Sequence, residues 1–139
     1  MSLTFAQAND EMLTLFKTAW DATGHDAFYE SVRQQRETDL TPWASVFVRH
    51  TSGGQASLSG SSGTRLFRRE GVITVRIYSS QGSGLSEAYG LAKVVADAYE
   101  GVSTPGGAWF RDVRINENGR DGQFIVVSVL IDFQYDEIK

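Results

Sequence analysis

The residues best placed to do chemistry are a short run of glycine and serine before a helical segment. Gly82-Ser83-Gly84 stands directly before the segment that begins at Leu85. Backbone N–H groups at the start of a helix can bind an anion, and the serine can instead cap the helix. The run lacks the rest of a dinucleotide fingerprint and the lysine of a nucleotide-triphosphate loop, and it is one residue too short for a serine nucleophile elbow. A capping turn is the better interpretation.

Other reactive side chains are few and scattered. His25 and His50 have no second histidine or carboxylate at metal-ligand spacing, so we expect them on the surface or in loops. The adjacent carboxylates Asp10-Glu11 and Asp136-Glu137 are typical of a solvated surface. The chain has no cysteine, which excludes disulfides, thiolate metal sites and cysteine nucleophiles. We therefore predict no catalytic residues, no metal and no cofactor.

Length and composition indicate a single domain over residues 1–139. Hydrophobic residues make up 41% of the chain and charged residues 22%, which is enough apolar material for a core. The net charge of −4 disfavours a protein that binds nucleic acid directly. The first residues do not read as a signal peptide, and no stretch approaches the roughly 18 apolar residues that span a bilayer.

Apolar periodicity predicts two helices. The first covers residues 4–23, where Thr4 and Gln7 have capping-box spacing and Gly24 is placed to end the helix. The second runs from residue 85 to about Gly101, with Ser83 as its cap. Its buried stripe is expected to comprise Leu85, Ala88, Leu91, Ala92, Val95, Ala98 and Tyr99.

Strands are predicted from alternation and β-branched residues. The ranges are 43–50, 65–70 with 72–79 (two strands, or one bent at Gly71), 109–115 and 124–135. In the strand over 72–79, Arg76 and Tyr78 fall on the polar face. In the strand over 109–115, we expect Trp109, Val113 and Ile115 on one face and Phe110 on the other. A hairpin loop is expected over 116–122. Residues 25–42 fit a short strand, an irregular segment or a helical turn.

Residues 51–64 are rich in glycine and serine. Such a composition buries little apolar surface, so we expect a flexible loop or a long hairpin tip. Two roles are open for this loop: it orders on contact with a partner during assembly, or it is a passive connection.

Arginines gather in the same part of the chain. Either they belong to a solvated strand face or they form a contact surface. Arginine is suited to protein interfaces because its planar donors pair with acidic groups. The residues that we select for a contact with another subunit or another protein are Arg65, Phe67, Arg68, Arg69, Arg76, Tyr78, Arg111 and Arg114.

The order of these parts resembles one family. The residues that carry the resemblance are Pro42-Trp43-Ala44-Ser45-Val46-Phe47-Val48, Gly71-Val72-Ile73-Thr74-Val75-Arg76-Ile77-Tyr78, Gly82-Ser83-Gly84, and Ala88, Leu91-Ala92, Val95-Ala96-Asp97 and Tyr99-Glu100-Gly101. Over residues 1–135 the chain is similar to the phage tail terminator-like proteins of long-tailed phages. Residues 25–42 depart from the family's usual pattern.

The resemblance implies a structural protein and not an enzyme. Such proteins cap the head-proximal end of the tail tube as a six-membered ring, halt tube growth and offer a surface for head attachment. The implied fold is α+β, a twisted mixed, mostly antiparallel sheet with two main helices packed on it. The implied partners are copies of the chain, the tail tube protein and a head-completion protein, without membrane or cofactor. The implied location is the virion tail, after assembly in the bacterial host cytoplasm.

Two other functions stay open at this point. A neck or head-completion protein is also a small ring-forming joint. A small-ligand-binding α/β domain would use a cleft near the Gly82-Ser83-Gly84 turn, where a helix start can hold an anion.

Overall fold

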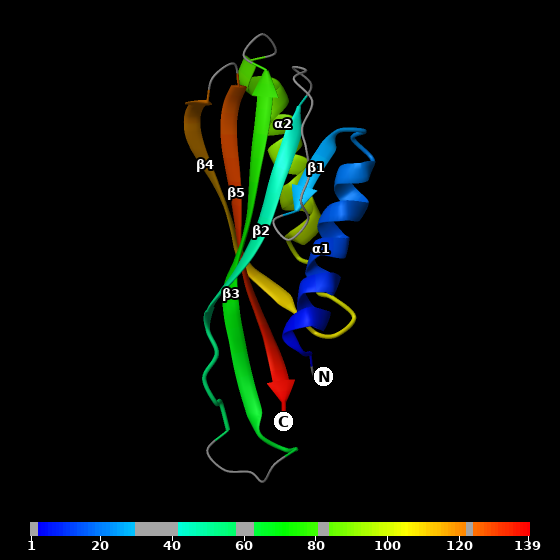
Figure 1. Ribbon diagram of the computed structural model, residues 1–139, viewed down its shortest axis with the longest axis vertical. Coiled ribbons are helices and arrows are strands. Elements are labelled where there is room, and N and C mark those ends of the chain that lie inside the picture. The colour runs from blue at the N-terminus through cyan, green and yellow to red at the C-terminus, as the bar shows by residue number, and fades with distance from the viewer. Residues whose placement is uncertain (1–2, 30–41, 58–62, 81–83, 122–123) are drawn as a thin grey trace.

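The computed structural model describes residues 3–29, 42–57, 63–80, 84–121 and 124–139. Within these residues, two helices and five strands follow one another (Figure 1). They are α1 (Phe5–Asp21), β1 (Asp26–Tyr29), β2 (Trp43–Ser52), β3 (Leu66–Ser80), α2 (Gly84–Tyr99), β4 (Trp109–Asp121) and β5 (Phe124–Ile138). The predicted α+β class is confirmed, because the two helices pack on one mixed sheet.

The five strands form one sheet in the order β1-β2-β3-β5-β4. β1 runs parallel to β2, and the other neighbouring pairs are antiparallel. β3 and β5 pair along their whole length, from Leu66 opposite Ile138 to Ser80 opposite Phe124. Of the unassigned residues 25–42, Asp26–Tyr29 form a short strand, and residues 30–41 lie outside the described part of the chain.

Local signals account for α1. The Thr4 hydroxyl accepts a hydrogen bond from the Gln7 backbone N–H at 3.3 Å, and the Gln7 side chain accepts from the Thr4 N–H at 3.0 Å. This is the predicted capping box, and it satisfies two N–H groups that the helix leaves open. Gly24 follows the helix with a φ of 75°, as predicted for a helix stop. The buried face carries Ala8, Met12, Phe16 and Trp20.

β3 passes through Gly71 without a break, which decides between the two predicted alternatives. A Cβ on Gly71 would collide with the carbonyl oxygen of Arg49 and with the ring of Phe133. Glycine therefore permits three strands to approach closely here. The irregularity lies in β2 instead, because His50 pairs with Gly71 and Ser52 pairs with Glu70, which leaves one extra residue between them.

The glycine- and serine-rich segment starts later than predicted. Thr51 and Ser52 still belong to β2. Beyond them, the Arg68 N–H donates to the Gly54 carbonyl at 2.9 Å, and the Ala56 N–H donates to the Leu66 carbonyl at 2.7 Å. The hairpin interpretation is thus confirmed for residues 51–57, since backbone hydrogen bonds continue past the end of β2. Residues 58–62 lie outside the described part, and the flexibility of the segment stays a prediction.

α2 carries most of its predicted buried stripe. Ala88, Leu91, Ala92, Val95 and Tyr99 are buried, and Ala98 is half-buried. The prediction was wrong for Leu85, which is 47% exposed, because it shares the edge of the helix with the exposed Tyr89 four residues on. Gly101 ends the helix with a φ of 70°. The proposed cap Ser83 lies outside the described residues.

β4 corrects two predictions. Residues 116–121 continue the strand and do not form the predicted loop, because a bulge between Glu117 and Gly119 takes up the extra residue. A second bulge follows Phe110 and reverses the alternation of faces. Phe110 therefore faces the helices, where its ring lies 4.8 Å from that of Tyr99, and it shares this face with Val113. Trp109 is 44% exposed.

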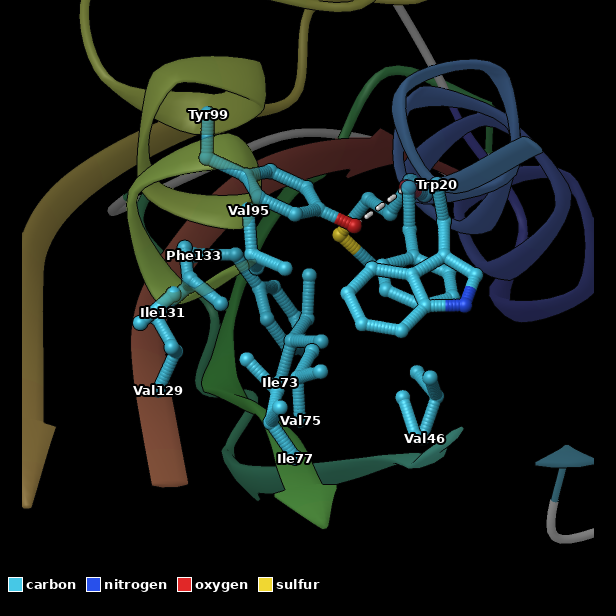
Figure 2. Packing of buried hydrophobic residues seen from close by; sticks show 14 of the residues in the cluster. Trp20, Val46, Ile73, Val75, Ile77, Val95, Tyr99, Val129, Ile131 and Phe133 are labelled. Atoms are coloured by element: carbon cyan, nitrogen blue, oxygen red, sulfur yellow. Dashed lines mark hydrogen bonds between the residues drawn. The ribbon is translucent and has the colours of Figure 1, made fainter. Parts of the chain in front are cut away.

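The core lies between one face of the sheet and both helices (Figure 2). Trp20 from α1 and Tyr99 from α2 lie next to the side chains of the sheet, and the Tyr99 hydroxyl points toward α1. The sheet side chains labelled there are Val46 from β2, Ile73, Val75 and Ile77 from β3, and Val129, Ile131 and Phe133 from β5. The other face carries no helix within the described residues, and we call it the open face.

One buried hydrogen bond joins the two helices. The Tyr99 hydroxyl donates to the Met12 carbonyl at 2.8 Å, drawn as the dashed line in Figure 2. We expect Tyr99→Phe to lower the free energy of unfolding by about 1–1.5 kcal/mol, since it removes this bond and leaves a buried acceptor. Tyr89→Phe on the exposed side of the same helix is the control, with an expected change below about 0.5 kcal/mol. Equal effects of the two changes in urea unfolding would contradict the expectation.

Candidate assembly surface

The long strands continue into an arm beyond the helices, at the end of the molecule where the C-terminus lies (Figure 1). We define the arm as residues 53–57, 63–70 and 134–139. Its outer end is closed by two backbone hydrogen bonds between Arg65 and Lys139, at 2.9 and 3.2 Å. Four of the eight predicted contact residues lie here, namely Arg65, Phe67, Arg68 and Arg69.

Arg69, one of the predicted contact residues, is buried within the arm. Only 8% of its surface is exposed. Its guanidinium lies 2.9 Å from the Glu137 carboxylate and donates to the Gly53 carbonyl at 2.7 Å. It also lies over the rings of Phe5 and Phe67, at 5.0 and 5.2 Å from their centroids. Arg69 therefore holds together the strands of the arm and the first turn of α1.

The neighbouring arginines remain on the surface of the arm. Arg65 is exposed, and Arg68 lies 3.5 Å from Asp136 with about half of its side chain exposed. Phe67 is half-buried, and the Lys139 ammonium lies 5.2 Å from its ring centroid. The outer surface of the arm thus presents positive charge beside partly covered aromatic surface.

The predicted arginines of β4 are both engaged in ion pairs. Arg114 lies 2.7 Å from Asp132 and 3.0 Å from Asp112. The hydrogen bonds that the Arg114 guanidinium donates to these two carboxylates raise its pKa above the ordinary value. Arg111 lies 3.6 Å from Glu70 at the base of the arm. Their charges are therefore largely balanced within the molecule.

A different group forms on the open face. The rings of Trp43 and Tyr78 are stacked, with centroids 3.9 Å apart. Arg49 and Arg76 both lie over the ring of Phe47, at 5.1 and 5.4 Å from its centroid. We call these five residues the aromatic–arginine patch. Arg76 and Tyr78 are predicted contact residues, and the structure separates them from those on the arm.

Sequence reasoning missed that the half-buried Trp43 and Phe47 and the exposed Arg49 share the open face. Aromatic and β-branched residues predict the strand over 43–50, but this prediction does not assign its residues to the two faces of the sheet. The signal was present, because Trp43, Ser45, Phe47 and Arg49 alternate with the buried or partly buried Ala44, Val46 and Val48. A period of two therefore places the patch residues together on the face that lacks helices.

His50 lies at the junction between the arm and the body. Its Nε2 is 2.6 Å from the Tyr135 hydroxyl, and its ring meets the rings of Phe5 and Phe133 edge-on. His50 is exposed, as predicted for a surface histidine, while its ring packs against these aromatic side chains. Burial, followed by the positive charge of Arg69, lowers its pKa below the ordinary value. Burial raises the pKa of Tyr135 to about 12, so its hydroxyl keeps the proton that it can donate to Nε2.

This junction predicts a pH dependence of stability. An unfolded histidine takes up a proton near pH 6.5, whereas folded His50 resists protonation down to a lower pH. The free energy of unfolding should therefore be fully maintained above about pH 6.5 and fall as the pH decreases below it. We expect His50→Gln to flatten this part of the profile, measured by urea unfolding at stepped pH. An unchanged slope in the variant would assign the dependence to other groups.

The described residues contain few features of a ligand site. The Gly82-Ser83-Gly84 turn falls mostly outside them. One hollow of about 310 Å³ is lined by Glu100, Gly101 and residues 110–113, and another of about 230 Å³ lies between α1 and Tyr29. No three His, Asp or Glu side chains gather to hold a metal within the described part. No helix there is long and apolar enough to cross a membrane.

Comparison with known proteins establishes the fold. No family model matches the chain, and no curated protein matches its sequence. A solved structure is similar to it with a TM-score of 0.64, over 91% of this chain and 94% of the other. The two sequences are 12% identical. A likeness at this identity supports the architecture of the sheet and helices but assigns no activity.

Proposed function

We propose that this protein is a tail terminator-like structural protein of a long-tailed phage. It assembles as a ring on the end of the tail tube, stops tube growth and presents a surface for head joining. The observation that carries this proposal is the open face, which bears an aromatic–arginine patch on a fold whose order of parts resembles that family.

The composition of the open face supports a contact with protein. An antiparallel sheet with one solvated face usually presents polar side chains there. Here the face carries Trp43, Phe47 and Tyr78 with two arginines, and Val126 is buried in the same face. Tryptophan, tyrosine and arginine are the residue types most enriched in the energetic centres of protein interfaces. A surface of this kind fits assembly better than small-molecule chemistry.

The proposed partners are other copies of the chain, the tail tube protein and a head-completion protein. The role requires no catalytic residue and no cofactor. Its place is the virion tail, after assembly in the host cytoplasm. The arm supplies a second surface for these partners, because it reaches beyond the helices and carries Arg65 and Arg68 on its outside.

Tube growth in the presence of the protein tests the proposal. Purified tail tube protein is polymerised with and without this chain, and tube lengths are measured by electron microscopy. We expect shorter tubes, each with extra density at one end. Tubes of unchanged length and bare ends would contradict the terminator function. Binding to a head-completion protein without binding to tubes would instead identify a neck component.

A further inference from the structure

Another surface with exposed apolar side chains lies where α2 meets β4. Leu85 and Tyr89 on α2 are 47% and 40% exposed, and Ile115 on β4 is 42% exposed. The Tyr89 hydroxyl donates to the Glu117 carboxylate at 2.7 Å, which ties the two elements together. We call Leu85, Tyr89, Ile115 and Glu117 the α2–β4 rim. It combines three large apolar side chains with a carboxylate.

The rim and the aromatic–arginine patch lie on opposite faces of the sheet. Ile115 pairs with Val129, whose side chain belongs to the core beneath the helices. The patch residues instead occupy the open face. One molecule therefore cannot bring its own patch and rim together.

The two surfaces lie at the same height along the strands. Tyr78 pairs with Val126, which pairs with Gly119. In the next rung, Ile77 pairs with Val127, which pairs with Glu117. If the patch of one copy contacts the rim of the next, the second copy is therefore displaced little along the strand direction. A head-to-tail contact of this kind closes into a ring when the rotation between neighbouring copies allows it.

The charges of the two surfaces are complementary. Residues 5–29 and 84–101, which contain both helices, carry seven Asp and Glu but only two Lys. On the open face, the patch carries Arg49 and Arg76, whose guanidinium groups lie over the ring of Phe47. Opposite charges favour an approach in which the open face of one copy meets the helix side of another, and like charges disfavour contact between two open faces.

We propose that the aromatic–arginine patch of one copy docks on the α2–β4 rim of a second copy. The contact is head-to-tail, because each copy offers its patch to one neighbour and its rim to the other. Aromatic side chains of the patch cover Leu85, Tyr89 and Ile115, and its arginines face the carboxylates of the helix side. The inference rests on the proposed ring function, and it names the surfaces that meet in the ring.

Cross-linking through engineered cysteines tests the contact, since the natural chain has none. Ser45 lies opposite Arg76 of the patch, between Trp43 and Phe47 on β2, and Ser86 is exposed beside Leu85. The full chain carrying Ser45→Cys and Ser86→Cys is treated with a short bis-maleimide. We expect a ladder of linked copies. Each single variant should give no linked species, because a head-to-tail contact never places two identical positions together.

Two variants serve as controls for this experiment. Ser45→Cys with Thr18→Cys keeps the patch cysteine and moves the second one to an exposed site on α1. It should give no ladder above background. Adding Arg76→Glu to the Ser45→Cys and Ser86→Cys pair should lower the linked yield about tenfold at low salt, through like-charge repulsion with the acidic helix side.

The outcomes separate the contact from the proposed function. A strong dimer from Ser45→Cys alone would overturn the proposal, because it would show two open faces meeting. No ladder from the paired cysteines, at the highest soluble concentration and with tail tubes present, would also overturn it. A ladder that does not end at a closed ring, or rings that fail to stop tubes, would support the contact and reject the terminator function.

Discussion

Replacing Gly71 by alanine is expected to lower the free energy of unfolding by about 3 kcal/mol, near the upper end for overpacking a well-packed site. The new methyl group would overlap the carbonyl oxygen of Arg49 and the Cα of His50, which are backbone atoms of the paired strand. It would also press on the ring of Phe133. Because backbone atoms of a hydrogen-bonded strand cannot move aside individually, β2 and β3 must separate. Urea unfolding followed by circular dichroism measures the loss.

Gly90→Ala is a matched control for this substitution. Gly90 lies within α2, and a Cβ there meets nothing within 4 Å. Alanine should stabilise the helix by about 0.5–1 kcal/mol, since glycine loses more chain entropy on folding. The same change of residue is thus expected to act with opposite signs at the two positions. A Gly71→Ala variant as stable as the natural protein would show that the strands are not held in close contact.

The elements that were predicted well depend on neighbours in the sequence. The capping box of Thr4 and Gln7 and the stop at Gly24 involve residues within one turn of the helix end. Strand β5 is recognisable from the alternation of its side chains over many residues. Such signals are readable because the interactions that produce them are local.

The errors arose where a strand departs from regular pairing. The bulge after Phe110 reverses the faces of β4, and the bulge before Gly119 lets the strand continue through residues expected to turn. Both depend on the register with β5, which the sequence of β4 alone does not reveal. The extra residue of β2 opposite Gly71 is a third case. In each of them, tertiary pairing overrides the local pattern.

The predicted contact residues also show which features depend on sequence neighbours and which depend on strand pairing. A cluster of arginines predicted a charged surface, but it did not distinguish Arg69, which is buried, from Arg68 next to it. Alternation along β3 assigns the two residues to different faces. Only the pairing with β5 places Glu137 beside Arg69. To predict the aromatic–arginine patch, one must also know that both helices lie on the same side of the sheet.

Replacing Arg69 by methionine is expected to cost about 3 kcal/mol, as for a buried ion pair that loses one partner. The Arg69 and Glu137 side chains are only 10% and 14% exposed, so the remaining carboxylate would be left largely out of water without its cation. The Gly53 carbonyl would lose its donor as well. Methionine keeps much of the side-chain volume, so the change isolates the charge and its hydrogen bonds.

The effect should concentrate in the arm, and two variants test this. Hydrogen exchange at the Arg65 and Lys139 amides, which close the arm, should accelerate more than exchange at the centre of β3. Arg68→Met is the matched control, since the Arg68–Asp136 pair is solvent-exposed and its loss should cost less than about 1 kcal/mol. Adding Glu137→Gln to Arg69→Met should recover part of the stability, because it removes the unpaired charge. Equal losses for Arg68→Met and Arg69→Met would show that burial of the Arg69 guanidinium contributes nothing to holding the arm.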